Sequence, residues 1–310
     1  MGSGHGRRRL SEVSEATRAL APDAAGARHG EAGEIRIEPV TGALGAEVLG
    51  VDLARPLSDA AFATIREAFL RHGVIFFRDQ SLDIPAHKAF ASRFGTLFLH
   101  PNIQGSKSDP AVIDIVRNPG DTRIIGEDWH SDAPQVPRPP MGSVLYAVDV
   151  PAYGGDTLFA SQYAAYEALS AGLRKMLDGM RALHSDRRVA GPARDLGQSN
   201  AQKKKSDDEW RETASYHPVV RTHPDTGRKA LYLNRQTTIA FEDMTEAESK
   251  PLLDYLCLHA HRPEFTCRFR WRNGSVAFWD NRCTQHVAVN DTGVSRRVMR
   301  RLQIEGDAPF

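Results

Sequence analysis

The chain has 310 residues, of which 41% are hydrophobic and 25% are charged, as in an ordinary globular protein. Its 40 Lys and Arg residues nearly equal its 39 Asp and Glu residues, so a nucleic-acid partner is not expected, because such a surface needs a basic excess. No run of about 18 apolar residues occurs, so no membrane span is expected either.

The N-terminal residues 1–34 are rich in Ala, Gly, Ser, Glu and Arg and contain no apolar segment like that of a signal peptide. We therefore expect a disordered tail over 1–34, followed by a single domain over 35–310. Neither a disulfide framework nor a cysteine zinc site is expected, because the cysteines are odd in number and not closely paired: Cys257, Cys267 and Cys283. The predicted location is a reducing cytoplasm.

Strands and helices alternate in the first part of the expected domain. Phe62, Ile65 and Phe69 recur at helical spacing and would share one face of a helix. The predicted elements are strands at 35–40 and 46–51, a helix capped by Ser58 and ended by Gly73, a strand at 74–77, and a helix after Pro85.

A third helix is predicted to begin at Ser170, with apolar residues at helical spacing: Leu173, Met176, Leu177 and Met180. Residues 187–215 are polar and lack periodic apolar positions. They predict a mobile loop, for which a solvated insertion is favoured over a lid that closes an active site.

Thr245 and Glu248 have the spacing of a capping box and predict the start of a further helix. Pro251 interrupts this start, so the first turn is expected to lie nearer the proline. One side of this helix would carry Leu252, Tyr255, Leu256 and His259.

Residues 265–271 alternate between apolar and polar side chains, which is the clearest strand pattern in the chain. The dipeptide Asn273-Gly274 then predicts a hairpin that pairs this strand with 275–279. Short strands at both ends, with helices between them, favour an α+β domain around an antiparallel β core.

The pattern His-x-Asp occurs three times: at His130/Asp132, His184/Asp186 and His223/Asp225. Two imidazoles and one carboxylate on one face of a metal ion leave the opposite face open, as in non-heme Fe(II) oxygenases. His130 and Asp132 would lie on the same face of an extended segment. Spacing alone gives this pair only a modest preference, since His223 belongs to a turn-like stretch and His184 follows a helix.

Three motifs resemble the family of taurine dioxygenase and 2,4-dichlorophenoxyacetate dioxygenase, and they occur in the family's order. They are EDWHSD at 127–132, GGDT at 154–157 and WDNRCTQH at 279–286, and the ending RRVMRR at 296–301 also fits. The resemblance covers about 35–310. It implies a double-stranded β-helix (jelly-roll) core with flanking helices, Fe(II), and 2-oxoglutarate as cosubstrate.

Residue by residue, the resemblance assigns His130, Asp132 and His286 as iron ligands. Arg297 and Thr157 match the residues that bind the distal carboxylate of 2-oxoglutarate, a role that suits a planar guanidinium. Trp279 matches a tryptophan near the iron, although a core aromatic is at least as good an explanation of it.

His100 and Arg301 match residues of the substrate pocket in relatives, so a small anionic organic substrate is expected. Ile103 and Gly126 stand where taurine dioxygenase has a tyrosine and an asparagine, which argues against taurine itself. The candidate substrates are then a sulfonate, an alkyl sulfate or an aryloxyalkanoate. Residues 125–130 also resemble the corresponding segment of the phenoxypropionate-cleaving branch of the family.

The implied reaction consumes O2, hydroxylates the substrate and releases succinate and CO2, and the product can fragment. Asp132 favours hydroxylation, because related halogenases have a small residue there. Two alternatives are a zinc-dependent hydrolase with the same ligands and a non-catalytic jelly-roll binding protein. Arg297 and Thr157 argue against the hydrolase, because a hydrolase needs no anchor for a dicarboxylate. The complete ligand set argues against the binding protein, because binding alone needs no open iron face. A homo-oligomer is expected.

Overall fold

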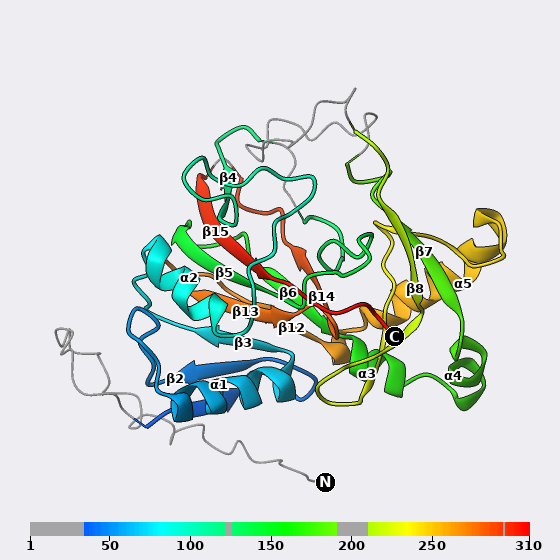
Figure 1. Cartoon of the computed structure of the whole chain (residues 1–310), viewed down its shortest axis with the longest axis horizontal. Helices are drawn as coiled ribbons and strands as arrows, with labels where there is room; N and C mark the ends of the chain where they lie inside the picture. Colours follow the sequence, from blue (N-terminus) through cyan, green and yellow to red (C-terminus); the bar gives the residue numbers. More distant parts are fainter. Residues whose placement is uncertain (1–33, 122–125, 191–209, 294) are drawn as a thin grey trace, which may run out of the picture. The chain divides into compact units, whose positions relative to one another are not determined.

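The computed structural model describes residues 34–121, 126–190, 210–293 and 295–310. This part of the chain has a mixed α/β fold with a β-rich core (Figure 1). None of its helices is long and apolar enough to cross a membrane. The predicted tail lies outside the described residues except for Glu34, so its disorder stays a prediction.

The largest sheet has seven strands drawn from both ends of the described chain. Neighbouring strands are antiparallel except β2 and β3, which are parallel. The spatial order is β1 (Arg36–Pro39), β2 (Ala46–Leu49), β3 (Val74–Phe77), β13 (Val276–Asp280), β5 (Gly142–Asp149), β15 (Arg297–Ile304) and β4 (Ile113–Arg117).

A second sheet packs against the first and encloses an apolar core. It contains β12 (Thr266–Phe269), β6 (Thr157–Ser161) and β14 (Thr284–Ala288), in that order. Phe76 of β3 stacks on Phe269 of β12 with ring centroids 4.0 Å apart, and Phe159 of β6 lies 5.7 Å from Phe76. These contacts join the two sheets face to face, because the rings come from both.

Two helices cover the large sheet on its other side. Helix α1 (Asp59–His72) begins at Ser58, whose side chain accepts the Ala61 N–H, and ends at Gly73, where φ is 69°. Phe69 stacks on Phe278 of β13 at 4.1 Å. Helix α2 (Ile84–Ser92) follows. The predicted boundaries of α1 are confirmed.

Most of the remaining elements contribute to a second apolar cluster that includes helix α5. Leu256 of α5 is fully buried in this cluster. The elements are β7 (Arg181–Ser185), β8 (Ala214–Pro218), β9 (Val220–Thr222), β10 (Lys229–Leu231), β11 (Thr238–Phe241), α3 (Gln162–Glu167), α4 (Ala171–Leu177), α5 (Glu246–Ala260) and the 3-10 turn η1 (Pro263–Phe265).

The predicted hairpin around Asn273-Gly274 is wrong. A turn forms there, but β12 pairs with β6 while β13 pairs with β3 and β5. The Asn273 side chain accepts the Val150 N–H at 2.8 Å, and a Cβ on Gly274 would lie 2.7 Å from the Gln80 carbonyl oxygen. These contacts hold the turn against the large sheet, so the chain passes from one sheet to the other.

Helix α5 starts earlier than expected. Thr245 and Glu248 form a capping box, so the helix begins at Glu246 with Pro251 inside it. The capping box satisfies amide groups that would otherwise lack partners, which fixes the start before the proline. The predicted buried side is also partly wrong, because Tyr255 is half exposed while Leu253 is buried. In α4, Met176 is likewise half exposed.

The predicted loop 187–215 is shorter than expected at its C-terminal end. Ala214 and Ser215 belong to β8 and pair with β7. Arg187 and Arg188 form ion pairs with Glu246 at the start of α5. Residues 191–209 lie outside the described part, so the mobile loop or lid stays a prediction.

His87 of α2 makes stability dependent on acidity. Burial, helped by the charge of Arg300, lowers the pKa of His87 from 6.5 to about 3. Between these values the unfolded chain binds a proton that the folded chain does not, so stability falls as the pH drops below 6.5. At pH 5 this group alone removes about 2 kcal/mol.

We therefore expect His87→Phe to reduce the acid sensitivity of the fold. Urea unfolding of the metal-free protein at neutral pH and at about pH 5 gives the free energy of unfolding. The fall between the two should be smaller in the variant by about 2 kcal/mol. Equal falls in both proteins would contradict the shifted pKa.

Candidate metal centre

His130 and His286 lie side by side although they are far apart in the sequence. The backbone N–H of His130 donates to the His286 carbonyl at 3.0 Å, and the reverse bond is 2.8 Å. His286 belongs to β14, where it pairs with Phe159 of β6. The two ring centroids are 4.2 Å apart, so the sheet itself brings the imidazoles together.

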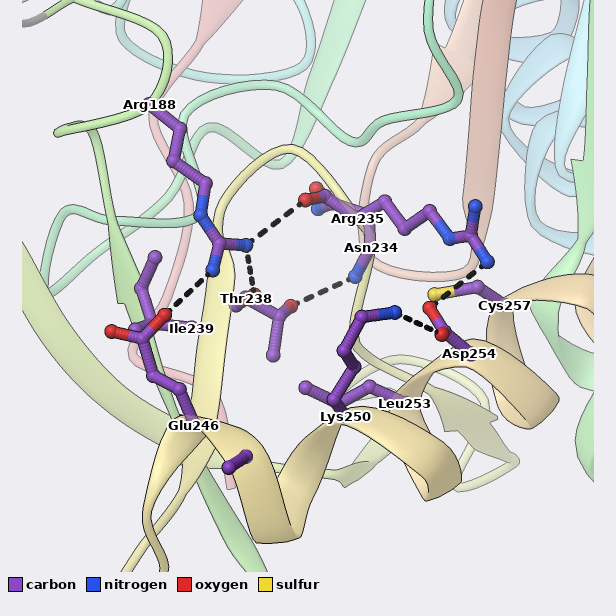
Figure 2. Close-up of a pocket in the computed structure, with 11 residues that line it drawn as sticks. Arg188, Asn234, Arg235, Thr238, Ile239, Glu246, Lys250, Leu253, Asp254 and Cys257 are labelled. Carbon is purple, nitrogen blue, oxygen red and sulfur yellow. Dashed lines mark hydrogen bonds and ion pairs between the residues drawn. The ribbon is translucent and has the colours of Figure 1, made fainter.

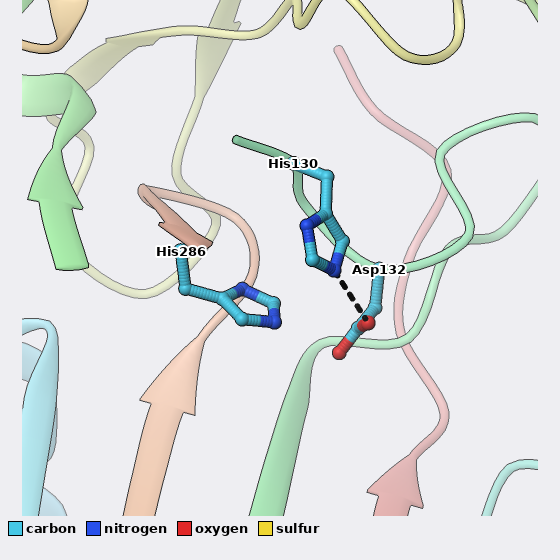
Figure 3. Close-up of side chains that lie close together, drawn as sticks. All are labelled: His130, Asp132 and His286. Atoms are coloured by element: carbon cyan, nitrogen blue, oxygen red, sulfur yellow. Dashed lines mark ion pairs between the residues drawn. The ribbon is translucent and has the colours of Figure 1, made fainter. Parts of the chain in front are cut away.

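Asp132 completes a group of three ligand-type side chains (Figure 3). Its Oδ1 lies 3.8 Å from Nε2 of His130, and one ligand atom of each residue lies within 4.8 Å of the others. Asp132 and His286 are buried. The arrangement can hold a cation, because three donors converge on one point.

The protonation of the two imidazoles suits a metal ion. Nδ1 of His130 lies 2.7 Å from the carbonyl oxygen of Asp128, which only accepts, so Nδ1 carries the proton and Nε2 keeps a lone pair. Burial lowers the pKa of His130, and it lowers the pKa of His286 well below the usual value. Neutral imidazoles with one carboxylate are a donor set that fits Fe(II).

Asp132 is held as a carboxylate. Burial alone would raise its pKa, but the charge of Arg301 and the hydrogen bond from Ser143 outweigh that effect and hold the pKa below its usual range. Nη1 of Arg301 donates to Oδ1 of Asp132 at 3.1 Å. The structure therefore places Arg301, predicted as a substrate residue, directly beside the group of three.

A buried polar network fixes the orientation of Asp132, and the sequence reasoning missed it. The Ser143 hydroxyl accepts from the Asn281 amide at 3.4 Å and from the Gln303 amide at 3.2 Å. Its single proton is then directed to Oδ2 of Asp132, at 2.6 Å. Asn281 also accepts the Asp132 N–H at 3.3 Å. Asn281 stands inside a quoted motif, whereas Ser143 is only a polar residue within a mainly apolar strand and Gln303 is one of several polar residues in β15.

We expect Ser143→Ala to weaken metal binding by about 10- to 100-fold, because partners that orient a ligand have effects of this size. Competition between the protein and a chelator for Fe(II) or Co(II) measures the affinity. Ser92→Ala, at the exposed end of α2, is the control. Wild-type affinity in Ser143→Ala would contradict the role of the network.

Trp279 packs against the metal centre rather than supplying a ligand. Its ring centroid lies 4.5 Å from that of His286, and its indole N–H donates to Asn281 at 2.9 Å. The ring is almost fully buried. Trp279 therefore orients both an imidazole and the network behind Asp132.

Arg297 and Thr157 both lie beside Trp271. The Trp271 indole N–H donates to the Thr157 hydroxyl at 3.0 Å, and the Arg297 guanidinium carbon lies 6.0 Å from the centre of the Trp271 ring. Nε of Arg297 is buried and has no partner in the described ranges, while Nη2 donates to the Gly155 carbonyl at 3.2 Å. Burial and then the charge of Arg117 lower the pKa of Arg297 to about 10, so it stays cationic at neutral pH.

The two positions that depart from the taurine pattern are Ile103 and Gly126, and they lie in different surroundings. Ile103 lies in the loop of His100: Nδ1 of His100 accepts the N–H groups of Asn102 and Ile103, both at 3.1 Å, and these bonds orient the His100 ring. Gly126 has φ 82°, and a Cβ there would lie 3.0 Å from Cε1 of His130. A Cβ at 126 would therefore require the His130 ring to shift by a few tenths of an ångström. Ile125 lies outside the described residues.

The other two His-x-Asp pairs do not form comparable centres. His223 contacts Asp280 at 3.0 Å instead of pairing with Asp225, and Cys283 lies beside them. Both oxygens of Asp280 are bonded to Arg282, at 2.8 and 2.7 Å, so a guanidinium already occupies the cation position. Asp186 accepts from the Asn102 amide at 2.7 Å.

A cavity of about 520 Å³ lies along α5, and it contains none of the predicted site residues (Figure 2). Its cations are neutralised within the cavity: Arg188 pairs with Glu246 at 3.0 Å, and Arg235 pairs with Asp254 at 2.9 Å. The cavity therefore lacks the converging donors of the metal centre.

The chain matches the model of the taurine catabolism dioxygenase TauD, TfdA family over residues 36–303. It is 36% identical over 280 residues to an alpha-ketoglutarate-dependent sulfate ester dioxygenase of Pseudomonas putida, covering 89% of this chain and 91% of the relative. It is 32% identical to an (S)-phenoxypropionate/alpha-ketoglutarate-dioxygenase of Sphingobium herbicidovorans, covering 87% and 95%. A solved taurine dioxygenase from Burkholderia xenovorans superposes with a TM-score of 0.76 at 38% identity, covering 89% of this chain and 90% of that one.

Proposed function

The chain belongs to the TauD/TfdA family, and from this premise we propose that His130, Asp132 and His286 hold the Fe(II) of its reaction. The protein is a dioxygenase that uses 2-oxoglutarate, the alpha-ketoglutarate of its relatives' names. The convergence of two neutral imidazoles and one ionised carboxylate within 4.8 Å carries the assignment. The two facing sheets would then form the double-stranded β-helix.

Arg297 and Thr157 would bind the distal carboxylate of 2-oxoglutarate. The unpartnered Nε and the cationic state of Arg297 support this role, since a guanidinium offers two parallel N–H groups to a carboxylate. The Thr157 hydroxyl accepts from Trp271, which leaves its own proton for a further acceptor. A metal-dependent hydrolase would need neither residue.

When bound, Fe(II) supplies the activation of O2, coupled to the decarboxylation of 2-oxoglutarate to succinate and CO2 and to hydroxylation of a substrate C–H bond. The protein's own groups prepare the site for this chemistry. Asp132 stays ionised, and the proton on Nδ1 of His130 keeps Nε2 free. Trp279 and Phe159 lie beside the His286 ring and exclude water from that side.

The substrate is proposed to be a small organic anion. Arg301 supports this, because its guanidinium lies at the metal centre, 3.1 Å from Asp132, and its buried Nε has no partner among the described residues. Relatives are named for sulfate esters and phenoxypropionate, so a sulfonate, an alkyl sulfate or an aryloxyalkanoate is the expected class. Hydroxylation next to the ether or ester oxygen gives a product that fragments. His100 stays a predicted pocket residue, and a cytoplasmic homo-oligomer stays a prediction.

Purified protein supplied with Fe(II) and 2-oxoglutarate tests this proposal. Alkylsulfonates, alkyl sulfates and both enantiomers of aryloxypropionates are added in parallel, and O2 uptake and succinate are measured. One class of anion should increase both. Product formation from any of these anions without O2 would favour the zinc hydrolase, and iron binding without any O2 uptake would favour a non-catalytic binding protein.

A further inference from the structure

Two arginines face each other at the edge of the large sheet. Arg117 ends β4 and Arg297 begins β15, and the two are direct partners in the antiparallel register. Side chains of directly opposite residues lie on the same face of a sheet, and like charges there destabilise it. The pair is therefore unfavourable unless a negative group lies between or beside the guanidiniums.

The hydrogen bonds of both guanidiniums go to uncharged oxygens. Arg117 donates to the Thr292 hydroxyl, to the Asp121 carbonyl at 3.2 Å and to the Gly293 carbonyl at 3.1 Å. Arg297 donates to the Gly155 carbonyl. Nε of each arginine is buried, and neither has a partner among the described residues. Each of the two cations thus retains an N–H donor that no group within the described part of the chain accepts.

The nearest acidic side chains are already engaged elsewhere. Asp121 accepts the Asn118 N–H at 2.8 Å, and Asp291 accepts the Gly155 N–H at 2.6 Å. Asp156 is paired with Arg268 through Oδ2 at 2.6 Å, whereas its Oδ1 is buried without a partner among the described residues, and its charge acts to raise the pKa of Arg297. None of these carboxylates forms an ion pair with Arg117 or Arg297 within the described part of the chain.

Gly155 lets the backbone approach this pair closely. Its φ is 68°, and a Cβ would lie 2.7 Å from Cγ2 of Thr292 and 3.1 Å from Nε of Arg297. Thr292 is the residue that Arg117 holds through its hydroxyl. The glycine therefore brings Thr292, and with it Arg117, close to the arginine that is proposed to bind the cosubstrate.

We propose that Arg117 is a second cation of the cosubstrate site, so that two guanidiniums act together on the distal carboxylate of 2-oxoglutarate. The inference rests on the proposed function. A carboxylate beside both side chains removes the repulsion between them and accepts their unused N–H groups. The pKa of Arg297 is lowered by burial and by the charge of Arg117, and the charge of Asp156 offsets this lowering only in part.

A purely structural role for Arg117 makes different predictions. Its bonds to Asp121, Thr292 and Gly293 tie together two connecting segments. If these ties were its only role, removing Arg117 would lower the stability of the protein without cosubstrate, and it would affect every ligand of the metal alike. A cation of the cosubstrate site affects only ligands that carry a distal carboxylate.

The experiment compares Arg117→Gln and Arg117→Lys with wild type, and uses Arg300→Gln as the control. Arg300 lies on the same ladder, opposite Asp114, and pairs with it at 3.3 Å. Calorimetry of the anaerobic Fe(II) protein measures binding of 2-oxoglutarate and of pyruvate, which lacks the distal carboxylate. Melting of the metal-free proteins without cosubstrate measures stability.

We expect Arg117→Gln to weaken 2-oxoglutarate binding by at least about tenfold and Arg117→Lys to retain part of the wild-type affinity. Pyruvate binding should be the same in all variants. The melting temperature of the metal-free Arg117→Gln protein without cosubstrate should not fall below that of wild type. Equal 2-oxoglutarate affinity in wild type and Arg117→Gln would overturn the inference, as would an equal loss for pyruvate. No 2-oxoglutarate binding by wild type would instead contradict the proposed function, which separates the two failures.

Discussion

His130→Ala is expected to abolish 2-oxoglutarate turnover and to release the bound iron. Removing a partner of a metal ligand weakens binding by about 10- to 100-fold, and removing the ligand itself has a larger effect. His286 and Asp132 alone would leave the ion with two protein donors. Iron content after desalting, together with succinate formation, measures both losses.

The fold should survive this substitution, because alanine keeps the backbone N–H and carbonyl of residue 130 that bond to His286. His72→Ala provides the matched control, since His72 lies at the end of α1, in a different element. Its iron content and turnover should equal those of wild type. Full turnover in His130→Ala would exclude the assignment of the iron ligands.

Arg297→Gln is expected to raise the KM for 2-oxoglutarate steeply while the protein still binds iron. Truncating one partner of a buried charge pair costs about 2 to 5 kcal/mol, which corresponds to about 30- to several thousandfold in affinity. Glutamine keeps an amide donor but lacks the positive charge and the two parallel N–H groups of the guanidinium. Succinate formation at increasing 2-oxoglutarate concentrations gives the KM.

Arg296→Gln is the control for this effect. Arg296 is adjacent in the chain but exposed, and it pairs with Asp149 at 3.0 Å on the surface. Its loss should leave the KM for 2-oxoglutarate unchanged, because exposed ion pairs contribute little. An unchanged KM in Arg297→Gln would remove the guanidinium from the proposed cosubstrate site.

The features that the sequence predicted well are local ones. Ser58 and Gly73 bound α1, and Thr245 with Glu248 caps α5, because a cap depends on a few neighbouring residues. At the start of α5 the capping box and Pro251 predicted different first turns, and the prediction that followed the proline was wrong. The expected hairpin failed for a different reason. The contacts of Asn273 and Gly274 are with distant residues, which no local pattern contains.

The metal centre could be predicted only in part. Three His-x-Asp pairs had similar spacing, and only the resemblance to a family pointed to His130 and His286 together. The backbone bridge that joins these residues is a tertiary contact. The network behind Asp132 also depends on pairing, because Ser143 meets Gln303 across β5 and β15. The proximity of Arg117 and Arg297 likewise depends on strand pairing, here between β4 and β15.

Calorimetric titration of 2-oxoglutarate into the anaerobic Fe(II)-loaded protein is the most direct test of the proposed centre. Wild type should bind one 2-oxoglutarate per chain. His130→Ala, treated in the same way, should retain no iron and show no metal-dependent binding, and Arg297→Gln should bind far more weakly. Absence of binding to the iron-loaded wild type, or equal affinity in all three proteins, would contradict the assignment of iron ligands and cosubstrate anchor.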